Sequence, residues 1–203
     1  SALSALVSNA KGSKDTSGTR KLAAQGISFG LIVTLSFMVI ALWLGPQLIT
    51  LVSEPGGYRD AGMGYFHWLI LALPGFMLAY GGNGILQAHG DSRSMQRALT
   101  AAFLLNVGLN PLLMFGIPGV WDGMGFNGIA LATVISQTGV MAFILVRIFQ
   151  LDVMQGVTLS EFKPDLASYR EIIGQMLPAT MAMMVMFFSA FVVQYALKGF
   201  GEH

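Results

Sequence analysis

Two asparagines four residues apart, Asn106 and Asn110, lie within a long stretch that contains no charged residue. Residues four apart share one face of an α-helix. Pro111 follows directly and has no backbone N–H, so the carbonyl of Val107 loses its usual helical hydrogen bond. Amide and carbonyl oxygens suit hard cations such as Na⁺. These residues predict a site for a small cation, and hydrogen bonding between neighbouring helices is an equally open alternative.

Three further uncharged polar residues in apolar stretches are candidate cation- or substrate-binding residues: Asn83, Thr133 and Gln137. Thr133 and Gln137 are again four residues apart, and we expect them at a depth comparable to that of the asparagine pair. Asn83 precedes a short charged turn by a few residues. For these three, hydrogen bonding between helices is the simpler interpretation.

The sequence carries no pattern for enzyme catalysis. It contains no cysteine, no HExxH zinc pattern, no GxSxG nucleophile and no phosphate-binding glycine loop. No Asp, Glu, Lys or Arg lies deep in an apolar stretch, so the usual intramembrane groups for proton coupling are missing from these residues. The formal net charge of +1 argues against a nucleic-acid partner. We therefore expect no enzyme activity, no resident cofactor or metal, and no nucleic acid.

The composition indicates that the solvent of this chain is largely lipid. Hydrophobic residues make up 54% of the sequence and charged residues 10%. Soluble domains carry roughly 25% charged residues. So few charges cannot cover the surface of a water-soluble domain of 203 residues.

Five stretches are long enough to cross a bilayer as helices, which takes about 20 residues. They are residues 22–53, 61–88, 98–121, 123–146 and 172–197. We expect residues 1–10 to be the end of a further span. The expected fold class is an all-α integral membrane protein, a polytopic helix bundle with five full transmembrane helices.

Basic residues are distributed unevenly over the loops between these spans. Two of them, Arg59 and Lys198, lie on one side, whereas nine lie on the other. Because cytoplasmic loops are enriched in Lys and Arg, we expect the side with nine to face the cytoplasm. The nine are Lys11, Lys14, Arg20, Lys21, Arg93, Arg97, Arg147, Lys163 and Arg170.

Three blocks of sequence resemble the multidrug and toxic compound extrusion (MATE) family. They are LQAHGDSR at residues 86–93, LNVGLNPLLMFG at residues 105–116 and GIALATVIS at residues 128–136. The blocks occur in the family's order and spacing. Supporting matches at residues 6–12, 177–179 and 199–202 extend the resemblance over essentially the whole chain.

The resemblance implies part of a twelve-helix transporter built from two six-helix lobes. On that map residues 1–148 form most of the N-terminal lobe, from the end of its second span through its sixth. Residues 149–171 are a cytoplasmic linker between the lobes, and residues 172–203 hold the first helix of the C-terminal lobe. The remaining helices of the transporter would lie outside residues 1–203.

The family exports small organic cations, including drugs, in exchange for Na⁺ or H⁺, which implies a multi-pass protein of the inner (plasma) membrane. One branch couples cations through an Asn-x-x-x-Asp pattern and a threonine. Its asparagine and threonine fall on Asn106 and Thr133, but its aspartate falls on Asn110. A neutral amide cannot be protonated as a carboxylate can, so proton coupling at this position is not expected and Na⁺ ligation would be weaker.

Two alternatives remain open at this point. A flippase for lipid-linked oligosaccharides belongs to the same superfamily and has a similar pattern of spans. Such flippases usually carry arginines that face a central cavity, and the spans of this chain contain none. The other alternative is a structural membrane protein without transport activity.

Overall fold

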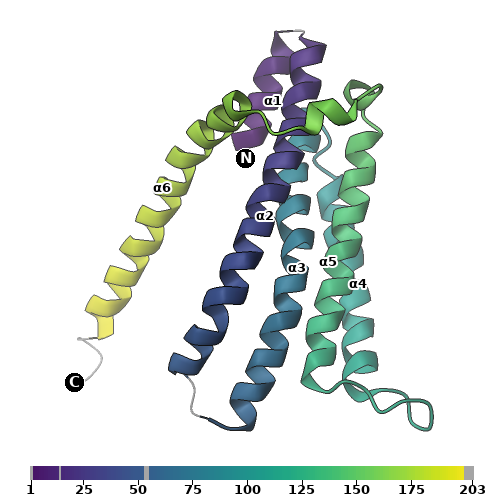
Figure 1. Ribbon diagram of the computed structural model, residues 1–203, viewed down its shortest axis with the longest axis vertical. Helices are drawn as coiled ribbons and strands as arrows, with labels where there is room; N and C mark the ends of the chain where they lie inside the picture. The colour runs from purple at the N-terminus through teal and green to yellow at the C-terminus, as the bar shows by residue number, and fades with distance from the viewer. Residues whose placement is uncertain (1, 14, 53–54, 199–203) are drawn as a thin grey trace.

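The computed structural model describes residues 2–13, 15–52 and 55–198. This part of the chain is helical, with a single isolated bridge between Ile117 and Trp121. The α-helices are α1 (Ala2–Gly12), α2 (Thr16–Val52), α3 (Gly57–Ala88), α4 (Ser94–Phe115), α5 (Phe126–Phe149) and α6 (Leu166–Lys198) (Figure 1). Two short 3₁₀ helices, η1 (Asp152–Met154) and η2 (Leu159–Phe162), lie between α5 and α6.

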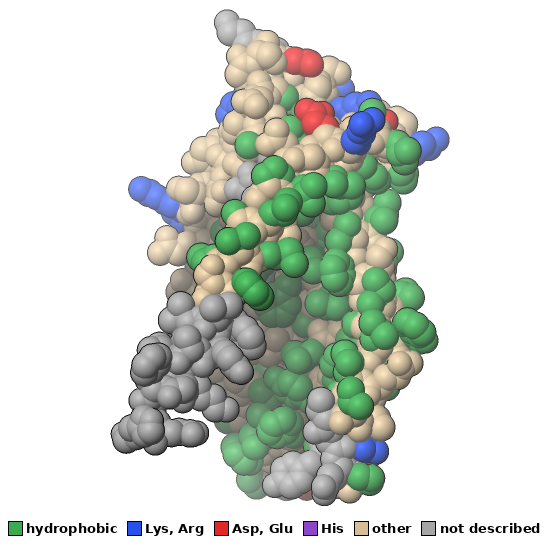
Figure 2. All heavy atoms as spheres, turned by 90° about the vertical axis from the view of Figure 1, so that its left-hand side faces the viewer, with side chains coloured by type: hydrophobic (Ala, Val, Ile, Leu, Met, Phe, Trp, Pro, Cys, Tyr) green, Lys and Arg blue, Asp and Glu red, His purple; other side chains and the backbone are tan. Residues whose placement is uncertain are grey.

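Five helices of the described chain are long and apolar enough to cross a membrane. Large apolar side chains such as Trp43, Phe103 and Phe187 are exposed on their outer faces. Figure 2 shows hydrophobic side chains along the length of the molecule, with most charged side chains gathered at one end. The predicted fold class, a polytopic membrane helix bundle with five full spans, is confirmed. The qualifying segments are Thr16–Leu51, Arg59–Ala88, Ser94–Phe115, Phe126–Phe149 and Leu166–Ser189.

The predicted span over residues 98–121 is wrong at its end. The helix α4 stops at Phe115, and the chain then forms a loop until α5 begins at Phe126, not at residue 123. Gly116 and Gly123 in this loop have φ angles of 75° and 60°. Glycine adopts such positive angles without steric cost, whereas other residues rarely do. The loop is apolar enough to resemble a span, but its glycines turn the backbone.

The other helices extend beyond their predicted spans. α2 begins at Thr16 and α6 at Leu166, whereas the charge-free stretches begin at residues 22 and 172. α5 continues through Arg147 to Phe149. The reason is physical: charge is excluded from the hydrocarbon core, but a helix can continue into the water beyond it. Absence of charge therefore marks the lipid-embedded part of a helix and not its ends.

Glycines bring α3 and α5 into close contact. A β-carbon built on Gly75 would lie 2.8 Å from the carbonyl carbon of Gln137, and one on Gly64 would lie 2.9 Å from Asn127 Oδ1. Gly64 contacts Asn127 and Gly75 contacts Gln137, so the residue numbers increase together along the two helices. α3 and α5 therefore run in the same direction. α5 packs against α4 on its other side, and α3 packs against α2. Small residues permit such close packing in membrane helices.

Gly75→Ala should destabilise the bundle by about 1–3 kcal/mol, because the added methyl group has no room against the backbone of α5. Gly81→Ala is the matched control, since a β-carbon at Gly81 on the same helix meets no atom within 4 Å. Thermal unfolding of the two variants in detergent measures the difference. Equal melting temperatures for both would contradict the close packing of α3 on α5.

Candidate functional site

Asn106 and Asn110 contact each other on α4. The side-chain amide of Asn110 donates a hydrogen bond of 2.9 Å from Nδ2 to Asn106 Oδ1. Both side chains are half-buried. Asn110 Oδ1 is buried and accepts no hydrogen bond from the described part of the chain. A buried polar atom without a partner is costly, so this oxygen is available to a ligand.

Pro111 lies inside α4 and places a second oxygen near this pair. Its ring nitrogen carries no hydrogen, so it cannot donate to the carbonyl of Val107, four residues earlier. Val107 lies between the two asparagines in sequence. One amide oxygen and one backbone carbonyl are thus available within a single turn of α4.

Thr133 lies on α5 at about the same depth as the asparagine pair. The two helices run in opposite directions: Gly128 lies against the backbone of Leu113, and Leu105 and Ser136 line one groove further along. These contacts put residues 106–110 level with about residues 131–135 of α5. The hydroxyl of Thr133 donates to the carbonyl of Ile129 at 3.1 Å, which leaves its lone pairs free.

Gln137 lies one turn beyond Thr133 on α5. Its Oε1 is buried and has no hydrogen-bond partner in the described structure. The backbone of Gln137 lies against Gly75 of α3, so this residue is held at a close contact between α3 and α5. Gln137 therefore adds a third available oxygen, on the α3 side of α5.

Asn83 lies apart from the other candidates. A β-carbon on its neighbour Gly82 would fall 3.0 Å from Ile144 Cγ2, so Asn83 is level with about residue 145 of α5. That level is about 18 Å along the helix from Thr133. Asn83 Oδ1 is also buried without a partner, but it cannot share a ligand with Asn110.

Two further buried oxygens lack hydrogen-bond partners and were not singled out from the sequence. They are Asn127 Oδ1 and Ser136 Oγ, both on α5. Asn127 lies near the first turn of α5, against Gly64, and Ser136 is 3% exposed. Their only sequence signal is a polar residue in a charge-free stretch, which many packed membrane helices share.

The turn between α3 and α4 is held by Asp91. Its carboxylate accepts hydrogen bonds from the backbone and hydroxyl of Ser94 at 3.0 and 2.6 Å, and it forms an ion pair with Arg147 at 3.1 Å. The Ser94 hydroxyl, followed by its backbone N–H and Arg147, lowers the pKa of Asp91 to about 2, against the opposing effect of burial. Since this pKa is lowered, the stabilisation is complete above about pH 4 and is lost only as pH falls towards 2. The charged turn thus ties α4 to the end of α5.

The segment between α5 and α6 is fastened onto α2 by Gln25. Gln25 is 1% exposed, and its Nε2 donates to the carbonyls of Glu161 at 2.6 Å and Lys163 at 2.8 Å. Its Oε1 accepts from the backbone N–H of Asp165 at 3.1 Å. One side chain of α2 therefore forms hydrogen bonds with three backbone groups that are far away in sequence.

Ion pairs strengthen this attachment. Arg20 Nε lies 2.8 Å from Glu161 Oε1, and Lys21 Nζ lies 2.7 Å from Asp165 Oδ2. The hydrogen bond from Lys21 lowers the pKa of Asp165 to about 2, and the Thr158 backbone N–H, followed by Arg20, lowers the pKa of Glu161. Both carboxylates are thus ionised at neutral pH, so these links stay formed there. A hydrogen bond between Ser28 and Tyr169 extends the attachment onto α6.

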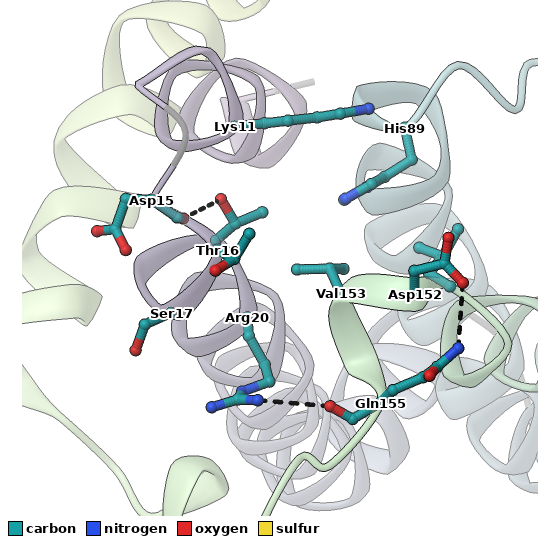
Figure 3. Close-up of a pocket in the computed structure, with 11 residues that line it drawn as sticks. Lys11, Asp15, Thr16, Ser17, Arg20, His89, Asp152, Val153 and Gln155 are labelled. Atoms are coloured by element: carbon teal, nitrogen blue, oxygen red, sulfur yellow. Dashed lines mark hydrogen bonds between the residues drawn. The ribbon is translucent and has the colours of Figure 1, made fainter.

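A cavity of about 600 Å³ lies beside this attachment, between α1, the start of α2, the end of α3 and η1 (Figure 3). Lys11 and His89 extend over it, and Arg20 donates to the carbonyl of Gln155 at 3.4 Å across its floor. Asp15 and Asp152 line it as well. Charges of both signs balance here, so the cavity selects neither anions nor cations.

Gln25→Leu should loosen the segment between α5 and α6, because the apolar side chain keeps the volume but removes three hydrogen bonds. We expect a loss of about 2–3 kcal/mol. Hydrogen–deuterium exchange should be faster at the amide of Asp165 and its neighbours. Gln47→Leu, at an exposed position of α2, is the control and should change nothing. Unchanged exchange at Asp165 in Gln25→Leu would contradict the attachment.

Comparison with known proteins assigns the family. The MatE family model matches residues 1–112, more than half of the chain. The chain therefore belongs to the MATE family of membrane transporters, which agrees with the predicted resemblance and with the prediction that it is not an enzyme. It is a multi-pass membrane protein embedded in a lipid bilayer.

Relatives and solved structures agree with this assignment. The multidrug export protein MepA of Staphylococcus aureus (strain MRSA252) is 23% identical over 97% of this chain and 42% of its own length. The probable multidrug resistance protein YoeA of Bacillus subtilis (strain 168) is 25% identical over 70% of this chain and 31% of its own length. The chain thus spans about two-fifths or less of the length of these curated relatives.

Two solved structures of a MATE family transporter of the MOP superfamily share the fold. The outward-facing conformation matches 94% of this chain and 41% of its own chain, with a TM-score of 0.75 and 22% identity. The inward-facing conformation matches 87% of this chain and 39% of its own chain, with the same TM-score and identity. The fold of the described helices is therefore shared with both conformations.

Proposed function

We propose that residues 1–203 act within a secondary active exporter of small organic cations in the plasma membrane, driven by a Na⁺ or H⁺ gradient. Family membership and the names of the relatives, which are called multidrug export or resistance proteins, support this proposal. The observation that carries the site is the buried Asn110 Oδ1, which accepts no hydrogen bond from the described chain.

The chemistry of the site favours Na⁺ over H⁺ as the ion bound there. The available groups at the depth of Asn110 are neutral oxygens: its own amide and the carbonyl of Val107 on α4, and the hydroxyl of Thr133 on α5. Neutral oxygens of this kind coordinate Na⁺ where membrane helices are interrupted. Neither α4 nor α5 contains an Asp or Glu, so neither helix offers a carboxylate that could take up a proton.

The alternatives receive less support. No finding favours a flippase for lipid-linked oligosaccharides, because the relatives described above carry the names of multidrug export or resistance proteins. A purely structural role accounts for the hydrogen bond between Asn106 and Asn110 and assigns no partner to Asn110 Oδ1 within the described chain. The exporter therefore remains the function that the site supports best.

Asn110→Leu in the full-length protein should weaken Na⁺-driven export of a cationic dye by about tenfold, because the loss of one ligand to a charged group costs about 1.5 kcal/mol or more. Asn110→Asp should strengthen the Na⁺ dependence or introduce a pH dependence, because a carboxylate adds a charge and a titratable proton. Dye efflux from cells that lack other pumps measures both effects.

Asn83→Leu is the matched control, because Asn83 also holds a buried oxygen without a partner but lies about 18 Å from Thr133 along the helix. Surface expression of each variant must equal that of the parent. If both Asn110 variants matched the parent in export and in ion dependence, the pair would serve only to hold helices together.

A further inference from the structure

A groove of about 500 Å³ lies between α4 and α5. Its walls are formed mainly by small or apolar side chains. A β-carbon on Gly139 would meet no atom within 4 Å, so the floor at that position is open. Little side-chain volume fills the space between the two helices here, so the groove has room for an apolar chain. The residues that form these walls are Ala98, Ala101, Ala102, Leu105, Gly139 and Phe143.

A buried hydroxyl lines this groove without a hydrogen-bond partner. Ser136 is 3% exposed, and its Oγ forms no hydrogen bond with the described structure. The other buried hydroxyls of the spans do find partners: Thr34 donates to the carbonyl of Gly30 at 2.7 Å, and Ser28 bonds to Tyr169. Apart from Arg97, Ser136 is the polar side chain in the lining of this groove.

Positive charge lies at one end of the groove. Arg97 lines the groove and also lines a second hollow of about 580 Å³ that contains Arg93 and Arg147. Arg147 is paired with Asp91. The guanidinium groups of Arg93 and Arg97 form no hydrogen bond or ion pair with the described part of the chain. Two positive charges without a salt-bridge partner in the described chain therefore lie at one end of an apolar groove.

This end of the bundle is the one that the basic residues predict to be cytoplasmic. The cytoplasmic leaflet carries anionic lipids, and basic pockets between membrane helices on this side bind anionic head groups. An organic cation would be repelled by Arg93 and Arg97, so the groove does not suit the exported substrate. An amphipathic anion with an apolar chain matches both the positive charge at the end of the groove and its apolar lining.

We propose that this groove binds one anionic phospholipid of the cytoplasmic leaflet. Its phosphate lies against Arg93 and Arg97, and one acyl chain follows the groove from Ala98 past Gly139. From Arg97 to Leu105 the groove extends about 12 Å along α4. The lipid fills the groove between α4 and α5, the helices that carry Asn110 and Thr133.

The test is lipid retention by the full-length protein, reconstituted in vesicles of phosphatidylglycerol and phosphatidylcholine in equal amounts and analysed by native mass spectrometry. The parent should retain phosphatidylglycerol at least about tenfold over phosphatidylcholine. Gly139→Leu, which fills the open floor, and Arg97→Gln, which removes a charge at the rim, should each lower that retention by about tenfold. Added inorganic phosphate should not displace the lipid.

Gly108→Leu is the matched control. Gly108 lies on α4 outside the groove, and a β-carbon there meets no atom within 4 Å. This variant should retain lipid as the parent does. Equal retention of both lipids by the parent, or full retention by Gly139→Leu and Arg97→Gln, overturns the proposal. Absence of any bound lipid also overturns it, because another part of the transporter then covers the groove.

Discussion

The close contact between α3 and α5 is the interaction on which the rest of the structure depends. Gly75 lets the backbone of α5 approach at Gln137, and this contact fixes the height of α5 in the bundle. α4 is positioned by α5, first where Gly128 meets Leu113 and again where Asp91 pairs with Arg147 at the opposite end. The depth of the asparagine pair is therefore set indirectly, by glycines on another helix.

The bilayer offers no water to polar groups, so each one must find a partner in the protein or in a ligand. The hydroxyl of Thr133 finds one in its own helix. The oxygens of Asn110 and Gln137 do not find one in the described chain. Gln137 lies where α5 meets α3, and Asn110 lies on α4 at a comparable depth. Together they are the candidate ion ligands of this chain.

Much of the architecture could be predicted from the sequence, because lipid excludes charge and the absence of charge is visible residue by residue. The five spans and the family follow from that pattern and from sequence blocks around residues 86–136. The loop after Phe115 could not be predicted by hydropathy, since its turns depend on the backbone angles of Gly116 and Gly123. The attachment of Gln25 to residues more than 130 positions away could not be predicted either, because it has no local signal. The division into lobes stays a prediction.

The central claim is the proposal that Na⁺ binds at Asn110, which requires that water and ions reach this residue in the whole transporter. Its most direct test is Asn110→Cys in the full-length protein, in a background without other cysteines, treated with a charged, membrane-impermeant thiol reagent. The account predicts that position 110 reacts and that Na⁺ slows the reaction, whereas Phe103→Cys, an exposed apolar position of α4, does not respond to Na⁺. A folded protein in which position 110 is unreactive would contradict the account and leave the asparagine pair as a structural contact.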